Sequence, residues 1–255
     1  MIDLHVHTRF SPDAEPTIEE VVKAAAEKGV EILGISDHYE LGPTLEEGDN
    51  FGDPLLYLEE IERVSKEYPL KVLKAVELGI QSYTDNSILN GAFDYFIYSI
   101  HEGPNFPDVT QPSKLWKAYL EESIAAVETL DFPGFFGHLD FLRRYLPDYV
   151  PLEPSPLLDE LLKLLVRKDL GLEINTSGLR KEFKEAHPQR WIIERYLSFG
   201  GKYLTIGSDA HRIEDLGKGF IEALRIIKSL DVKELFYCEE GNFVPVPVES
   251  FPLSF

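Results

Sequence analysis

The sequence predicts an α/β protein: a seven-stranded (β/α) TIM-like barrel forming a single domain over residues 1–255. Three observations support this prediction. Seven short runs rich in β-branched and aromatic residues recur along the chain, and amphipathic segments with helical spacing separate most of them. The length suits one large domain or two small ones, and the strand count is one unit short of the eight-stranded barrel.

The predicted elements alternate in chain order. We expect strands at 1–7, 31–38, 71–80, 93–101, 134–140, 171–177 and 203–211, and helices at 17–28, 54–68, 112–130, 155–169, 188–199 and 214–229. The first helix opens with a capping box of Thr17 and Glu20 and stops at Gly29. Three later helices have a proline where helices tolerate it, near their starts: Pro54, Pro112 and Pro188.

Two segments fall outside this alternation. The stretch 80–93 has no clear pattern, and the tail FYCEEGNFVPVPV predicts a strand or a hairpin. An open, doubly wound parallel sheet is the alternative to the barrel. Because no GxGxxG or Walker A sequence follows the first strand, the usual nucleotide-binding signature of that alternative is missing.

Composition excludes several classes of protein. No apolar run approaches the roughly 18 residues that span a bilayer, and the N-terminal sequence MIDLHVHTRF does not resemble a signal peptide. Cys238 is the only cysteine, so we expect no internal disulfide, no thiolate metal site and a cytoplasmic location. The net charge of −20 argues against nucleic-acid binding, because a phosphate backbone would be repelled.

Ionisable residues gather at the predicted strand ends. Six of the seven histidines lie there, namely His5, His7, His38, His101, His138 and His211, and so do Glu77 and Asp209. In a parallel barrel the carboxyl ends of all strands meet on one face, which carries the active site. His187 is the exception: it precedes Pro188 at a predicted helix start, and we interpret it as a surface or capping residue.

These residue types suit a metal site. His5 and His7 are alternate residues of one strand, so both imidazoles face the same side. Asp37 and Asp209 each lie close to a histidine. Such an aspartate can bind a metal, accept the proton of a ligating imidazole, or cap a helix; we expect Asp209 to be a ligand and Asp37 to support one. Glu77 ends an apolar run, where an ionised side chain needs a cation or a buried salt bridge.

The segments HVHTRFSPDAE, ISDH, AVELG, YSIH, GHLD and GSDAH, in this order, resemble the successive motifs of the PHP (polymerase and histidinol phosphatase) superfamily. The resemblance extends from residue 2 to about residue 212. GHLDFLRRY and LEINTSGLRK resemble its stand-alone histidinol-phosphatase branch. The resemblance to this superfamily implies a distorted seven-stranded (β/α) barrel and three divalent ions of zinc, iron or manganese. The implied ligands are His5, His7, Glu77 and Asp209 for the first ion; Glu77, His101 and His138 for the second; and Asp13, His38 and His211 for the third.

The same resemblance implies a metal-dependent phosphomonoesterase acting on L-histidinol phosphate in histidine biosynthesis, through a hydroxide that bridges two metals. A small phosphorylated molecule is then the expected partner, with neither nucleic acid nor membrane. Arg180, just after the sixth strand, is our candidate for binding the phosphate, although a solvated arginine at a helix start would have the same position. Arg143, Arg144 and Arg212 are weaker candidates.

Other functions compete with this one. A PHP-type enzyme could act on another phosphate ester, and a proofreading exonuclease would share the metal site but needs a basic groove. A metal-dependent amidohydrolase would commonly carry lysine at the fourth strand's end, where this chain has Ser99-Ile100-His101, and would have eight strands. A non-enzymatic metal-binding module would bind metal without turnover.

Overall fold

The computed structural model describes residues 1–41, 52–87, 89 and 91–251. Its main sheet has only parallel strand pairs. The strands follow one another in the order β1 (Ile2–Val6), β2 (Ile32–Ile35), β4 (Lys71–Gly79), β5 (Tyr95–Ser99), β6 (Gly134–Phe136), β7 (Gly171–Asn175) and β8 (Leu204–Gly207). The short β3 (His38–Glu40) pairs with the second half of β4 and was not predicted as a separate strand.

The last strand returns to the first. The amide of His7 donates to the carbonyl oxygen of Ala210 at 2.9 Å, and the amide of Asp209 donates to that of His5 at 2.7 Å. Val6 and Ala210 thereby form a parallel bridge between the two ends of the sheet. The sheet is therefore a nearly closed barrel, which confirms the predicted fold class and rejects the open doubly wound sheet.

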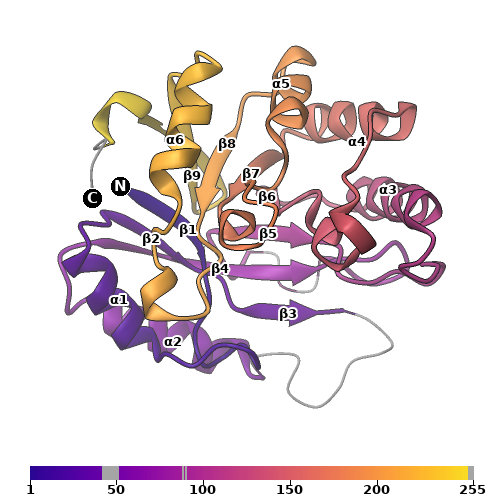
Figure 1. Ribbon diagram of the computed structural model, residues 1–255. Helices are drawn as coiled ribbons and strands as arrows, with labels where there is room; N and C mark the ends of the chain where they lie inside the picture. The colour runs from indigo at the N-terminus through magenta and orange to yellow at the C-terminus, as the bar shows by residue number, and fades with distance from the viewer. Residues whose placement is uncertain (42–51, 88, 90, 252–255) are drawn as a thin grey trace.

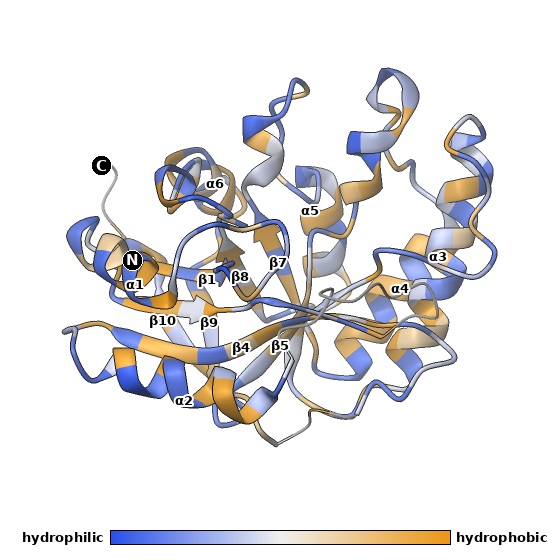
Figure 2. Ribbon diagram, turned by 90° about the horizontal axis from the view of Figure 1, so that it is seen from below, coloured by the Kyte–Doolittle hydropathy of each residue, from blue (hydrophilic) through white to orange (hydrophobic). Residues whose placement is uncertain are grey.

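Six helices surround the strands: α1 (Ile18–Glu27), α2 (Pro54–Ser65), α3 (Pro112–Glu128), α4 (Pro156–Arg167), α5 (Arg190–Ser198) and α6 (Phe220–Ser229), as Figure 1 shows for the described part of the chain. The capping box at the start of α1 is formed as predicted, with Thr17 and Glu20 each bonding the other's backbone. Figure 2 shows bands of hydrophilic and hydrophobic residues along α2. This alternation lets a helix cover the sheet with one face and contact water with the other.

The strands are mostly buried on both sides, because helices cover the outside and side chains fill the barrel. All five residues of β5 and all five of β7 are buried. Such strands read as nearly continuous apolar runs, so a charged residue inside one needs a specific partner.

Two predicted helices begin later than expected. The helix predicted from residue 188 starts at Arg190, because the amide of Gln189 donates to the side chain of Asp140 instead of joining a helix. The helix predicted from 214 starts at Phe220, because Gly217 and Gly219 have φ values of 67° and 86°, outside the helical range.

The segments without a clear pattern are now defined. The described residues between 80 and 93 form turns and no helix. The tail forms the predicted hairpin from β9 (Glu234–Glu239) and β10 (Asn242–Pro247).

Cys238 is buried in β9, and this burial raises the pKa of its thiol to about 12, as expected for a packing residue. Within the described ranges, no helix is long and apolar enough to cross a bilayer.

Candidate metal centre

The nine residues that the sequence suggested as metal ligands converge at one end of the barrel. His5, His7, Glu77 and His138 are almost fully buried, whereas His38, His101 and His211 are partly exposed. Seven of the nine line one cavity of about 660 Å³, with His5 and His7 beneath it: Asp13, His38, Glu77, His101, His138, Asp209 and His211. A cavity of this size can hold a small molecule.

Glu77 lies at the centre of the cluster. It is 1% exposed, and Ser99 donates a hydrogen bond to its Oε1 at 2.7 Å. Five imidazoles approach its two oxygens: His138 at 2.7 Å, His38 at 3.0 Å, His5 and His101 at 3.3 Å, and His7 at 3.4 Å. A carboxylate surrounded in this way is suited to bridge two cations.

The two aspartates complete the cluster. Oδ1 of Asp209 lies 3.4 Å from Nε2 of His7 and 3.4 Å from Nδ1 of His211. Asp13 is 59% exposed at its side chain, yet its oxygens lie 3.1 Å from Nε2 of His211 and 3.7 Å from Nε2 of His38. Asp13 therefore stands beside the two histidines with which the resemblance grouped it.

Both buried carboxylates of the site, and His7 among its imidazoles, have pKa values shifted toward the form that binds cations. Burial raises the pKa values of Glu77 and Asp209, but the surrounding histidines, His5 foremost, lower them more, so both lie well below the usual range. Burial, together with the nearby His211 and His38, lowers the pKa of His7 well below its usual value. Ionised carboxylates and neutral imidazoles are the forms that coordinate cations.

The donor atoms also lie close enough together to share a metal ion. Four groups of three residues each place one donor atom per residue within 4.8 Å of the others: His7, His38 and His211; His5, His7 and Asp209; His5, Glu77 and His138; and His38, Glu77 and His101. Nitrogen and oxygen donors in such a mixture fit divalent ions such as zinc, iron or manganese. The residues present thus fit divalent metal ions.

Asp37 has a different position from these donors. It is fully buried and accepts hydrogen bonds from the amide and hydroxyl of Thr8 and from the hydroxyl of Ser11, at 2.6 to 2.7 Å. Ser11 in turn contacts Nδ1 of His7 at 3.1 Å. Asp37 therefore holds the loop that follows β1 and, through Ser11, the ring of His7.

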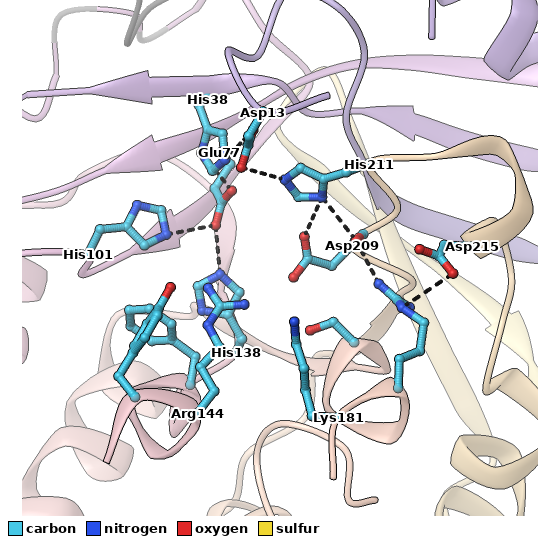
Figure 3. A pocket seen from close by; sticks show the side chains of 14 residues that line it. Asp13, His38, Glu77, His101, His138, Arg144, Lys181, Asp209, His211 and Asp215 are labelled. Carbon is cyan, nitrogen blue, oxygen red and sulfur yellow. Dashed lines mark hydrogen bonds and ion pairs between the residues drawn. The ribbon is translucent and has the colours of Figure 1, made fainter. Parts of the chain in front are cut away.

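Basic side chains form the facing wall of the cavity. Arg144 and Lys181 extend toward the histidines and carboxylates from the opposite side (Figure 3). The guanidinium of Arg144 lies 5.0 Å from the ring centres of both Phe141 and Tyr145, and its buried Nε has no hydrogen-bond partner among the described residues. Burial and the nearby Arg144 and Arg180 lower the pKa of Lys181.

The other arginines have different surroundings. Arg180 lines the cavity, but two of its nitrogens donate to the carbonyl oxygens of Ser208 and Asp209, at 2.8 and 2.9 Å. Its guanidinium is therefore partly engaged in holding the loop that carries Asp209. Arg143 pairs with Glu185, and neither it nor Arg212 lines the cavity.

His187 is not a surface residue, so its interpretation from the sequence was wrong. It is 1% exposed, and its Nδ1 lies 2.5 Å from Oδ1 of Asp140. The backbone of His187 pairs with Asn175, the last residue of β7, in an antiparallel bridge. Sequence periodicity contains no signal for the contact of His187 with Asp140, because the two residues lie 47 positions apart in the chain.

Replacing His187 with alanine should lower the free energy of unfolding by about 3–5 kcal/mol, because it leaves the Asp140 carboxylate buried without its side-chain partner. Denaturant titration followed by circular dichroism measures the change. The matched control is Arg195→Ala, which breaks the exposed pair with Asp159 and should change the free energy by less than about 1 kcal/mol. Equal effects of the two substitutions would contradict the prediction.

Fold and site together define a parallel α/β-barrel protein with a histidine- and carboxylate-rich site for divalent metal ions. The PHP domain family matches residues 3–177 of this chain. A probable histidinol-phosphatase of Thermotoga maritima is 32% identical over 92% of this chain and 94% of its own length, and one of Clostridium acetobutylicum is 29% identical over 93% and 96%. The chain therefore belongs to the PHP domain family.

A solved structure has the same fold. Histidinol phosphate phosphatase from Lactococcus lactis, crystallised with zinc, L-histidinol and phosphate, superposes with a TM-score of 0.81 and 24% sequence identity. The match covers 95% of this chain and 98% of that one. The likeness in fold therefore extends beyond residue 177, where the match to the family ends.

Proposed function

We propose that this protein is a histidinol-phosphatase, which hydrolyses L-histidinol phosphate to L-histidinol and phosphate with the help of divalent metal ions. The observation that carries the proposal is the cavity itself. A cluster of metal-type donors forms one wall and a group of cations the other, in a chain 32% identical to a probable histidinol-phosphatase over 92% of its length. A phosphate ester needs both walls, since its charge must be bound and its ester bond attacked.

We propose the nine clustered residues as the ligands of three divalent ions, with Glu77 shared between two of them: His5, His7, Asp13, His38, Glu77, His101, His138, Asp209 and His211. Bound divalent ions would supply an activated water and neutralise phosphate charge, which suits one of the slowest uncatalysed hydrolyses known. The chain's own contribution is to hold the donors. Ser99 orients Glu77, and Ser11 orients His7.

The cationic wall is proposed to bind the phosphate group. Arg144 and Lys181 face the metal-type donors, and Arg180 lies beside them. Arginine binds a phosphate dianion through charge-assisted hydrogen bonds, and the side chain of Arg144 lines the cavity. The rings of Phe141 and Tyr145 hold its guanidinium plane in place.

Arg144→Gln should raise KM for the phosphate ester about 10- to 100-fold with metal content unchanged, because a hydrogen bond to a charged group is worth about 1.5–3 kcal/mol. Arg180→Gln should also raise KM with metal retained. Steady-state kinetics and metal analysis measure both effects. The matched control is Arg143→Gln, whose guanidinium contacts Glu185 and the carbonyl of Tyr149 outside the cavity. If all three variants kept the KM of the parent, the cationic wall would not bind phosphate.

The function is tested by measuring phosphate release from L-histidinol phosphate after loading with zinc, manganese or iron, alongside a panel of small phosphate monoesters. We expect L-histidinol phosphate to be the best substrate. A higher kcat/KM for another ester would replace the substrate, and complete inactivity of metal-loaded protein would favour a metal-binding module. We place the reaction in the cytoplasm, in keeping with a lone buried cysteine.

A further inference from the structure

Glu173 is a buried carboxylate that lies behind the proposed metal ligands. It is the central residue of β7, is 0% exposed and does not line the cavity. The strand-end pattern did not single it out, because it lies inside a strand rather than at its end, and the resemblance carried by LEINTSGLRK assigned it no role. A carboxylate buried there is costly unless specific partners satisfy it.

The partners of Glu173 belong to the metal cluster. Its Oε1 lies 2.7 Å from Nδ1 of His5. Its Oε2 accepts a hydrogen bond from the backbone amide of His138 at 2.9 Å and another from the side-chain amide of Asn175 at 3.2 Å. One carboxylate thus contacts two of the proposed ligands, which come from strands at distant positions in the sequence.

The barrel leaves room for this carboxylate. Residue 207 is glycine, and a Cβ there would lie 2.4 Å from Oε1 of Glu173 and 2.4 Å from Cβ of His5. A side chain at this position would therefore clash with both Glu173 and His5. A Cβ at Gly137 would lie 3.5 Å from the other oxygen. Glycine at these two positions thus leaves room for the carboxylate of Glu173 beside His5.

The contact determines how His5 presents its ring. With a carboxylate oxygen 2.7 Å from it, Nδ1 of His5 is the nitrogen that donates a hydrogen bond, which leaves Nε2 as the nitrogen that can coordinate a cation. Nε2 lies 3.0 Å from Nε2 of His7 and 3.3 Å from Glu77, inside the proposed metal cluster. The second oxygen holds the backbone of His138, whose φ of 20° is unusual for a residue other than glycine.

We propose that Glu173 is a positioning residue of the metal centre: it holds His5 as the Nδ1–H tautomer with Nε2 toward a cation, and it fixes the backbone of His138. This inference rests on the proposed metal centre. Carboxylates behind ligating histidines raise ligand basicity and fix ring orientation, and their loss typically weakens metal binding about 10- to 100-fold.

The test compares Glu173→Gln, which keeps the side-chain volume and removes the charge, with the parent. Zinc affinity is measured by competition with a chromophoric chelator, and circular dichroism establishes that both proteins are folded. We expect zinc binding about 10- to 100-fold weaker in the variant. The matched control is Glu122→Gln on α3: Glu122 is 9% exposed, accepts hydrogen bonds from Ser82 and does not line the cavity.

Zinc affinity equal to that of the parent in Glu173→Gln, or an equal loss in Glu122→Gln, would overturn the inference in favour of a purely structural role. A second measurement does not require the variant to fold. Nitrogen-15 NMR of the zinc-loaded parent should show His5 protonated at Nδ1, and protonation at Nε2 would overturn the proposal.

The outcomes separate this inference from the proposed function. If the metal-loaded parent fails to hydrolyse L-histidinol phosphate, the substrate is wrong, while the ratio of zinc affinities still decides the role of Glu173. If the parent binds no divalent ion, the metal centre and the role of Glu173 are both overturned.

Discussion

Replacing Glu77 with glutamine should remove most of the bound metal and lower turnover of L-histidinol phosphate by more than about 10³-fold. Loss of one preorganised electrostatic group commonly costs about 10²–10³ in rate. Glu77 should exceed this range because its two oxygens are approached by five imidazoles. A neutral amide would present one oxygen and one NH₂ group, and the NH₂ group cannot bind a cation. Metal analysis of the purified variant and initial rates measure the two effects.

The control for this substitution is again Glu122→Gln, which changes the same chemical group at a mostly buried position outside the cavity lining. It should retain the metal content and rate of the parent. If Glu77→Gln kept both its metal and its turnover, the proposed bridging role would be wrong, and the cluster would have to be reassigned around Asp209.

Removal of the metal should lower the melting temperature by roughly 5–10 °C. A ligand that binds only the folded state stabilises it by about 2.7 kcal/mol at a free concentration 100 times its Kd, and each kcal/mol shifts the melting temperature by about 2–4 °C in a chain of this size. The physical source is the crowding of ionisable groups: His7, for example, has ring centres of His38 and His211 at 4.5 and 4.1 Å. Differential scanning calorimetry of chelator-treated and zinc-reconstituted protein measures the shift.

The same scans on Glu77→Gln provide the control. If stabilisation comes from the cluster, adding zinc to this variant should produce a much smaller shift than in the parent. An identical melting temperature for the metal-free and metal-loaded parent would show that zinc does not bind the folded state selectively.

The fold was predictable because its signals are local. A strand buried on both sides is mostly apolar, as in β5, and a helix start is marked by a capping box, as at Thr17 and Glu20. Where the chain departs from these signals, neighbouring segments intervene. The pairing of β3 with β4 and the contact of Gln189 with Asp140 depend on residues far away in the sequence.

The site was partly predictable for a geometric reason. Parallel strands bring their carboxyl ends together, so histidines placed after different strands must meet without any knowledge of side-chain conformation. Asp13 required the family resemblance, because in SPDAE it has the sequence context of a turn and is 59% exposed. For Arg180 only the position was predictable, since the two carbonyls that accept its hydrogen bonds follow a different strand.

The sequence by itself therefore determined the barrel, the end at which the site lies and the residues that gather there. Only the tertiary structure decided which groups support them. Glu173 meets His5 across 168 positions of the sequence, and His187 meets Asp140 across 47. Periodicity reports which face of an element is buried, but the partner of a buried charge depends on side-chain directions across the closed barrel. Those directions are defined only once β8 lies beside β1 in the folded chain.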